Sequence, residues 1–135
     1  MTLDELIGYY AAKPVTVIHP ALLIRVNKLY RHNMSQLELY EITRGIWKLG
    51  ERRNDVRYAL AVFEGVVREV YEIQSWYHAL TTSYTTRDLA ERDANGRWEF
   101  EGIRAPDDIR NQYYLGSARA YFRRGNRSPV VYVNS

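Results

Sequence analysis

Residues 57–73, RYALAVFEGVVREVYEI, limit the possible fold more than any other stretch of the chain. Two runs rich in Val, Ala and Tyr flank the dipeptide Glu64-Gly65, which is typical of a reverse turn. In the second run Val67 and Tyr71 alternate with residues of the other face, and polar side chains interrupt both sets. The pattern predicts a β-hairpin with one face only partly buried.

Further strands are expected on both sides of this hairpin, because short β-branched or alternating runs recur along the chain. These runs are ALLIRV at 21–26, IWKL at 46–49, GRWEFEGIR at 96–104 and VVYVN at 130–134. GERRND, at 50–55, is expected to form a polar turn. Residues 75–95 are Thr-rich, charged and without a clear period, which predicts a long loop of the kind that is often functional or mobile.

Helices are predicted by two capping boxes, in which a Thr or Ser precedes a Glu by three residues: TLDE at 2–5 and SQLE at 35–38. The first box opens a helix over residues 3–12. Pro106, with two acidic residues after it, predicts a third helix, and SARAYF at 117–122 predicts a short fourth one. The order of elements favours an α+β fold built on a small, largely antiparallel β-barrel with short helices at its rim.

The length of 135 residues fits one compact domain, with an N-terminal helix within residues 1–13 and a barrel core over residues 20–135. A hydrophobic share of 46% is enough to fill a core. No apolar run approaches the roughly 20 residues of a membrane span. Acidic residues stand near the start, where a signal peptide has basic ones. We therefore expect a cytoplasmic protein that makes no membrane contact.

The residue types exclude several kinds of site. The chain has no Cys, which rules out disulfides and thiolate ligands or nucleophiles. It has no glycine-rich phosphate loop, no HExxH and no GxSxG, and its three His lack the spacing of metal ligands. We therefore expect neither a metal nor a cofactor. The net charge is +3, and all but three of the 19 basic residues are Arg, which favours bidentate contact with phosphates.

The best candidate for a binding site is a group of aromatic and basic residues that begins at residue 44. A nucleobase needs a flat surface for stacking, and its phosphate needs guanidinium groups or backbone amides. The expected stacking residues are Trp47, Tyr58 and Trp76. The expected ligands of base edges or phosphates are Arg44, Arg52 and Arg53, and those of the nucleic-acid backbone are Arg123, Arg124 and Arg127. The alternative interpretation is that Trp47 lies in the core and the arginines are solvated.

The stretch from residue 44 to residue 76 resembles an uncharacterised bacterial domain that is found appended to GIY-YIG-type nuclease modules. The matching positions are Arg44, Gly45, Trp47, Gly50, Arg52, Arg53, 58–62, Gly65, Val67, 69–71, Ile73 and Trp76. The resemblance covers residues 20–135, although neither the GIY nor the YIG motif is present. The layout is also similar in outline to the PUA-like superfamily, which includes the EVE, YTH and ASCH domains. This resemblance implies a small β-barrel whose aromatic pocket binds a nucleobase, often a modified one.

Together these observations predict a nucleic-acid-binding module that reads a flipped or single-stranded base, modified or not, in DNA or RNA. A separate nuclease is a second expected partner. One alternative is an ASCH-like enzyme that hydrolyses a nucleotide or nucleoside, for which Glu69 is the candidate catalytic carboxylate because its strand neighbours are apolar. Another alternative is a protein-interaction module that regulates a partner nuclease.

Overall fold

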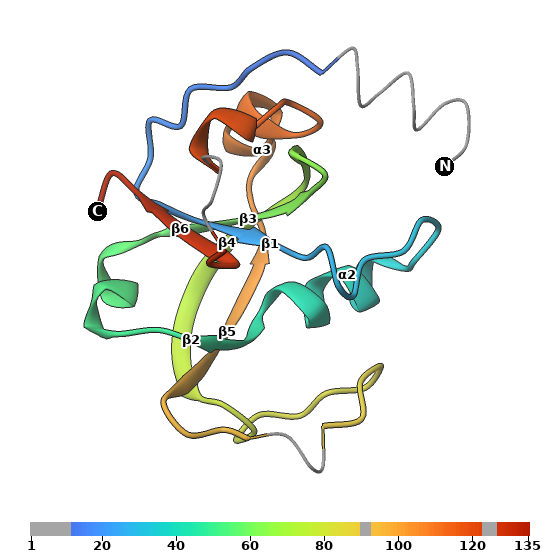
Figure 1. Ribbon diagram of the computed structural model, residues 1–135, viewed down its shortest axis with the longest axis vertical. Helices are drawn as coiled ribbons and strands as arrows, with labels where there is room; N and C mark the ends of the chain where they lie inside the picture. The colour runs from blue at the N-terminus through green and yellow to red at the C-terminus, as the bar shows by residue number, and fades with distance from the viewer. Residues whose placement is uncertain (1–11, 90–92, 123–126) are drawn as a thin grey trace.

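The structure, a computed structural model, describes residues 12–89, 93–122 and 127–135 (Figure 1). The described strands are β1 (Ala21–Arg25), β2 (Gly45–Lys48), β3 (Tyr58–Phe63), β4 (Val66–His78), β5 (Arg97–Arg104) and β6 (Val130–Val133). The described helices are α2 (Gln36–Thr43) and α3 (Asp107–Tyr113), with 3-10 helices η1 (Glu51–Asp55) and η2 (Arg119–Tyr121). The helix predicted over residues 3–12 lies outside the described residues, except for its last position.

The strands form one mixed sheet in the order β2-β5-β4-β3-β1-β6, which curls into a half-barrel (Figure 1). Four of its five strand pairs are antiparallel, and β1 and β3 are parallel. A parallel pair needs a long crossover connection, which α2, β2 and η1 supply here. The predicted α+β class is therefore confirmed, whereas a largely antiparallel sheet is only roughly right. Within the described chain, β2 and β6 are the two edges of the sheet.

β3 and β4 form the hairpin that the sequence predicts. Glu64 and Gly65 make its turn with φ angles of 50° and 77°, the left-handed conformation that a two-residue type I′ turn requires. A side chain at position 65 would also overlap the side chain of Arg119. The hairpin therefore depends on glycine at this position.

β4 continues to His78, although the sequence pattern predicted a loop from residue 75 onward. The end of β4 pairs with β5, and His78 lies directly opposite Trp98. This pairing joins segments about twenty residues apart in sequence, so tertiary context overrides the weak local strand signal. The irregular connection therefore begins only at residue 79.

The second capping box is present at the start of α2. Ser35 Oγ accepts the Glu38 N–H, and Glu38 Oε1 accepts the Ser35 N–H, each at 3.1 Å. These two bonds satisfy backbone donors that the first turn of a helix otherwise leaves without a partner. The polar turn predicted over residues 50–55 forms η1.

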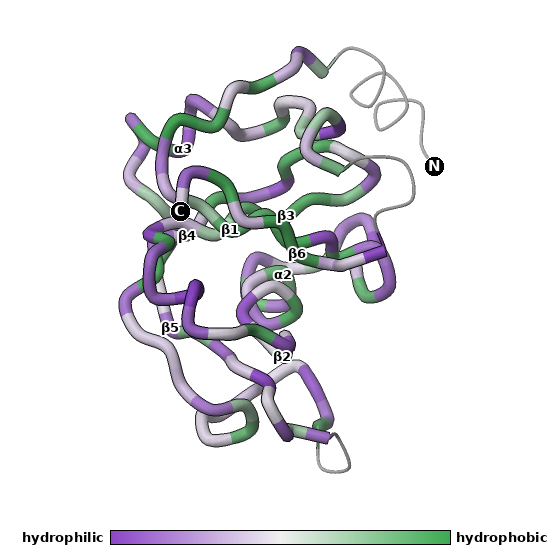
Figure 2. Tube along the Cα trace, turned by 60° about the vertical axis from the view of Figure 1, so that its left-hand side comes forward, coloured by the Kyte–Doolittle hydropathy of each residue, from purple (hydrophilic) through white to green (hydrophobic). Residues whose placement is uncertain are grey.

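Separate hydrophobic clusters occupy the two faces of the sheet. α3 covers one face, where Leu60, Val62 and Tyr113 are buried. α2 covers the other face, where Ile42 and Phe100 are buried. Figure 2 shows hydrophobic stretches at β1 and β3, two neighbouring strands of the sheet. The edge strands β2 and β6 are only partly buried, which leaves the open side of the half-barrel accessible.

Candidate functional site

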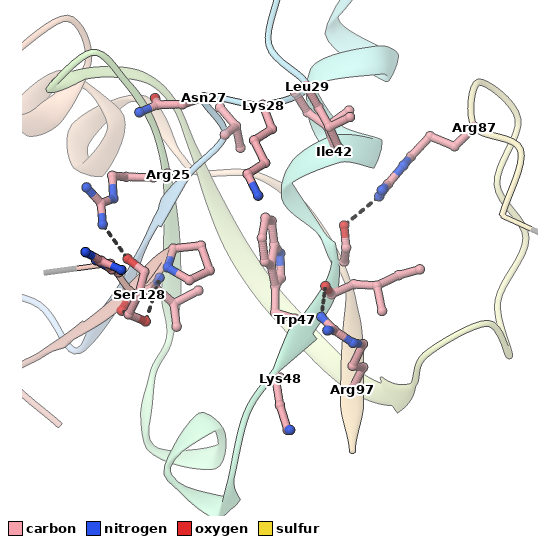
Figure 3. Close-up of a pocket in the computed structure, with 16 residues that line it drawn as sticks. Arg25, Asn27, Lys28, Leu29, Ile42, Trp47, Lys48, Arg87, Arg97 and Ser128 are labelled. Atoms are coloured by element: carbon pink, nitrogen blue, oxygen red, sulfur yellow. Dashed lines mark hydrogen bonds between the residues drawn. The ribbon is translucent and has the colours of Figure 1, made fainter. Parts of the chain in front are cut away.

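A pocket of about 850 Å³ lies at the open side of the half-barrel, between β2 and the segment that leads into β6 (Figure 3). Residues 25–29, at the end of β1, line it as well. The cations that line this pocket are Arg25, Lys28, Lys48, Arg87, Arg97 and Arg127. None of the described residues along its walls is an acid. The volume is typical of ligand sites, and the unbalanced charge favours an anion.

Trp47 stands in the middle of this pocket (Figure 3). Its indole Nε1 donates a hydrogen bond of 2.7 Å to the carbonyl oxygen of Thr43, the last residue of α2, which fixes the orientation of the ring. The side chain of Lys28 points toward it from the opposite wall. In the described part of the chain, no aromatic ring or guanidinium group stacks on Trp47. The half-buried indole is thus a fixed flat surface inside a basic pocket.

Backbone carbonyls hold arginine side chains along both walls. On the β6 side, Arg25 Nη2 donates to Ser128 O at 2.6 Å. On the β2 side, Arg87 Nη1 donates to Gly45 O, also at 2.6 Å. These bonds hold each guanidinium group at the pocket wall. A ligand that contacts them would therefore cost less side-chain conformational entropy on binding.

Three further cations of the pocket, Lys28, Lys48 and Arg127, are solvent-exposed. None of the three forms an ion pair with a carboxylate among the described residues. Their charge is therefore not neutralised locally. Because these cations lie in solvent, dissolved salt would screen their attraction to a ligand phosphate. Part of the binding free energy would therefore depend on the salt concentration.

The connection from residue 79 to residue 89 is anchored by a buried carboxylate from β5. Glu99 is fully buried and accepts the N–H groups of Leu80 and Thr82 at 2.7 and 2.8 Å. It also accepts the Thr82 hydroxyl and, at 3.2 Å, the Tyr84 hydroxyl. Burial raises the pKa of the Tyr84 phenol far above its ordinary value, so the phenol keeps its proton and remains a donor.

A second buried carboxylate, Glu41 of α2, anchors the same connection just before Arg87. It accepts the N–H groups of Thr85 and Thr86 at 2.8 and 2.6 Å, and the Thr86 hydroxyl at 2.5 Å. Burial opposes ionisation of Glu41, but these hydrogen bonds outweigh it and hold the pKa of the carboxyl below its ordinary value. Arg87, which lines one wall of the pocket, therefore belongs to a loop that two buried carboxylates, those of Glu41 and Glu99, hold in place.

Arg44 is buried in the fold, so its position does not fit the predicted contact with a phosphate. The residue is 2% exposed. Its Nε donates to Phe100 O at 2.9 Å, its Nη2 donates to Thr82 Oγ1 at 2.5 Å, and its guanidinium carbon lies 4.3 Å from the centre of the Tyr84 ring. Since no ligand reaches such a side chain without opening the fold, the prediction for Arg44 is corrected here.

Arg52 and Arg53 follow Trp47 closely in sequence but do not line its pocket. η1 directs them to other aromatic rings. The guanidinium carbon of Arg53 lies 3.3 Å from the centre of the Trp98 ring, and that of Arg52 lies 4.7 Å from the centre of the Tyr132 ring. Both arginines thus cover hydrophobic side chains of the neighbouring sheet.

The three predicted stacking residues are not brought together. Tyr58 is only 3% exposed and lies on the sheet face that α3 covers, with its ring centre 5.3 Å from that of His19. Trp76 is half-buried, and its ring lies edge-on against Phe100 with centres 5.4 Å apart. Tyr58 cannot offer a face to a base, so its predicted stacking role does not fit its position. Trp47 alone of these three lines the basic pocket.

Of the predicted backbone ligands, Arg127 lines the pocket. Arg123 and Arg124 lie outside the described residues. The pocket cations Arg25, Lys28 and Arg97 were not among the predicted site residues. Arg25 ends the hydrophobic strand β1, Lys28 follows it, and Arg97 opens β5. Such positions are a weak signal, because charged residues flank most strands.

Glu69, the catalytic candidate of the hydrolase alternative, does not line the pocket. It is 6% exposed and accepts hydrogen bonds from Arg110 of α3, with Nε at 2.6 Å from Oε1. This bond raises the pKa of the Arg110 guanidinium further above its ordinary value, so the guanidinium stays charged. The pair joins α3 to β4. Among the described residues, no group of three His, Asp or Glu could hold a metal ion.

No protein-family model, curated protein or solved structure matches the chain. None of the described helices is long and apolar enough to cross a membrane. The function has to be inferred from the geometry and chemistry of the pocket itself.

Proposed function

We propose that the pocket at the open side of the half-barrel binds single-stranded nucleic acid, or a base flipped out of a duplex. A base would stack on Trp47, and the phosphates would contact the surrounding cations. The observation that supports this proposal is the combination of one half-buried, oriented indole with six cations and no described acid in the same pocket. A nucleic acid is a ligand class that presents a flat ring and repeated negative charges together.

The proposal has an energetic basis in both contacts. Stacking of a base on an aromatic side chain contributes about 1–3 kcal/mol. Contacts with phosphates release counterions, which makes the affinity fall steeply as the salt concentration rises. We include in the proposal that the half-barrel is PUA-like and that the protein works in the cytoplasm beside a separate nuclease.

The test is a titration of tryptophan fluorescence with single-stranded DNA, single-stranded RNA and duplex, each at about 50 and 200 mM salt. We expect saturable quenching by at least one single strand, with weaker binding at the higher salt concentration. Trp47→Phe should remove most of the quenching, because Trp47 is the indole in the pocket. Trp76→Phe is the matched control, since Trp76 packs against Phe100 away from the pocket.

Two results would contradict the proposal. One is the absence of any quenching or anisotropy change with all three nucleic acids, while circular dichroism shows a folded protein. The other is binding that Trp47→Phe and Trp76→Phe change equally, because that outcome would place the ligand away from Trp47.

A further inference from the structure

The arginines of the pocket stand on two walls, which lie at opposite edges of the described sheet. On one wall, Arg25 ends β1 and Arg127 precedes β6, the edge strand that pairs with β1. On the other wall, Arg97 opens β5 beside the edge strand β2, and Arg87 donates to a backbone carbonyl of β2. Trp47 lies between Arg25 and Arg97 (Figure 3). Positive charge therefore flanks the indole on both sides.

Each wall has an arginine that no described carboxylate neutralises. Arg127 is exposed and Arg97 is half-buried, and neither forms an ion pair with an acid among the described residues. Arg97 Nη1 donates to Ile46 O at 3.5 Å, a weak bond to a neutral group that leaves the guanidinium charge in place. Val26 and Ile42, both buried, line the same pocket and suit the uncharged base and sugar of a nucleotide. Each wall can therefore attract an anion of its own.

From the cations on both sides of the indole we infer that the pocket takes an internal nucleotide of a strand, whose two phosphates contact opposite walls. An internal nucleotide carries one phosphate on the 5′ side and one on the 3′ side of its sugar. With its base on Trp47, each phosphate would face one wall. A nucleotide with phosphates on one side alone would leave the cations of the other wall without an anion. This inference rests on the proposed function, because it specifies which part of the nucleic acid the same pocket holds.

Thymidine 3′,5′-bisphosphate and thymidine 5′-triphosphate test this arrangement at equal charge. They share the base and the sugar, so stacking on Trp47 does not distinguish them. At about pH 8 each carries about four negative charges, since the last proton of a terminal phosphate leaves at about pH 6. The bisphosphate has its charge on both sides of the sugar, and the triphosphate has all of it on one side. A difference in affinity therefore reports where the protein places its cations, not how many it has.

The experiment measures how well each nucleotide displaces a fluorescently labelled dT oligonucleotide of about twelve residues, a length that spans a single-strand site. A chelator removes divalent cations, which would otherwise bind the triphosphate. We expect the bisphosphate to bind about tenfold more tightly than the triphosphate, the effect of one additional hydrogen bond to a charged group.

Variants of the two walls show whether both phosphates are bound. Arg127→Gln and Arg97→Gln each remove the charge of one arginine from one wall. Each should weaken binding of the bisphosphate by about threefold, the effect of one ion pair in contact with solvent. The triphosphate should respond to only one of the two variants. Lys13→Gln, an exposed position outside the pocket, should change neither affinity. Circular dichroism shows whether each variant is folded.

The outcomes separate the two proposals. If the oligonucleotide binds but the triphosphate displaces it as well as or better than the bisphosphate, the two-wall inference is overturned and the binding function is intact. The same holds if the bisphosphate displaces nothing at about 10 mM, which corresponds to binding weaker than about 3 kcal/mol. A preference for the bisphosphate that only one of Arg127→Gln and Arg97→Gln reduces, with both variants folded, also overturns the inference. The absence of oligonucleotide binding overturns the proposed function, and the inference with it.

Discussion

Trp47 and Trp98 lie directly opposite each other on the paired strands β2 and β5, yet among the described residues only the second indole is stacked by a cation and another ring. Arg53 stacks on Trp98 at 3.3 Å, and the ring of His78 stacks with it at 4.2 Å between centres. Trp47 has no such cover among the described residues and faces the pocket. Two neighbouring tryptophans thus have different surroundings: Trp98 is stacked within the sheet, and Trp47 lines the pocket.

Trp47→Ala should weaken binding of a single strand by about 1–3 kcal/mol, because the base loses its stacking surface. Trp47→Phe should retain part of the affinity, since a smaller ring remains. Anisotropy of a labelled oligonucleotide measures both effects. Trp98→Phe serves as the control, and we expect it to lower the unfolding temperature while leaving the affinity nearly unchanged. A larger loss of affinity in Trp98→Phe than in Trp47→Ala would contradict this assignment.

Neutral substitutions of the exposed pocket cations should reduce the salt dependence of binding. For Arg127→Gln and Lys28→Gln we expect the slope of log K against log salt to become less steep by about 0.7 each, the value for one phosphate contact of a single strand. The control is Arg104→Gln, an exposed arginine on β5 outside the pocket, 3.6 Å from Asp107. Dissociation constants measured at four or more salt concentrations give the slopes. Identical slopes for all three variants would contradict a phosphate contact of Arg127 and Lys28.

Glu41→Gln should destabilise the protein in a manner that depends on pH. Hydrogen bonds from Thr85 and Thr86 hold the folded-state pKa of Glu41 below its unfolded value of about 4.3. The ionised carboxylate therefore contributes its full stability above the unfolded pKa, and this contribution is lost as the pH falls through the folded pKa.

At about pH 7 we expect the Glu41→Gln variant to be less stable by about 1–3 kcal/mol, the range for hydrogen bonds to a charged group. The difference from the original chain should shrink as the pH falls through the folded-state pKa of Glu41, below which both side chains are neutral. Urea unfolding at a series of pH values measures it. A difference that stays constant over this range would show that the charge of Glu41 is not the cause.

Arg110→Met should cost about 3–5 kcal/mol, because it leaves the buried Glu69 carboxylate without its partner. The double variant Arg110→Met with Glu69→Gln should recover part of this loss, since the buried charge is removed as well. Chemical unfolding gives both values. Affinity for a single strand should not change in the folded variants. A loss of affinity in folded Glu69→Gln would support the hydrolase-type site instead.

The parts of the fold that local patterns predict are those with short-range causes. The turn at Glu64 and Gly65 and the capping box of Ser35 and Glu38 depend on residues that are close in sequence. The extension of β4 to His78 does not, because its hydrogen bonds come from β5. Sequence alone could therefore give the hairpin and the helix starts but not the full sheet.

The candidate site was predictable only in part, for the same reason. Trp47 belongs to the predicted group, but its sequence neighbours Arg52 and Arg53 turn away within η1. Three of the pocket cations, Arg25, Lys28 and Arg127, come from the end of β1 and from the segment before β6, which the antiparallel pairing of Ile24 with Val130 brings together. No local spacing reports such a pairing, so closeness along the chain was a poor guide to closeness in space.

The carbonyl groups of Gly45 and Ile46 have a consequence for how the protein behaves in a crowded solution. β2 is an edge of the described sheet, and unpaired strand edges are templates on which other chains add and aggregate. Here guanidinium groups already bind two backbone carbonyls of this strand. Positive charge on both sides of the opening also repels a second copy of the same chain. We therefore expect the arginines at the open side of the half-barrel to oppose self-association as well.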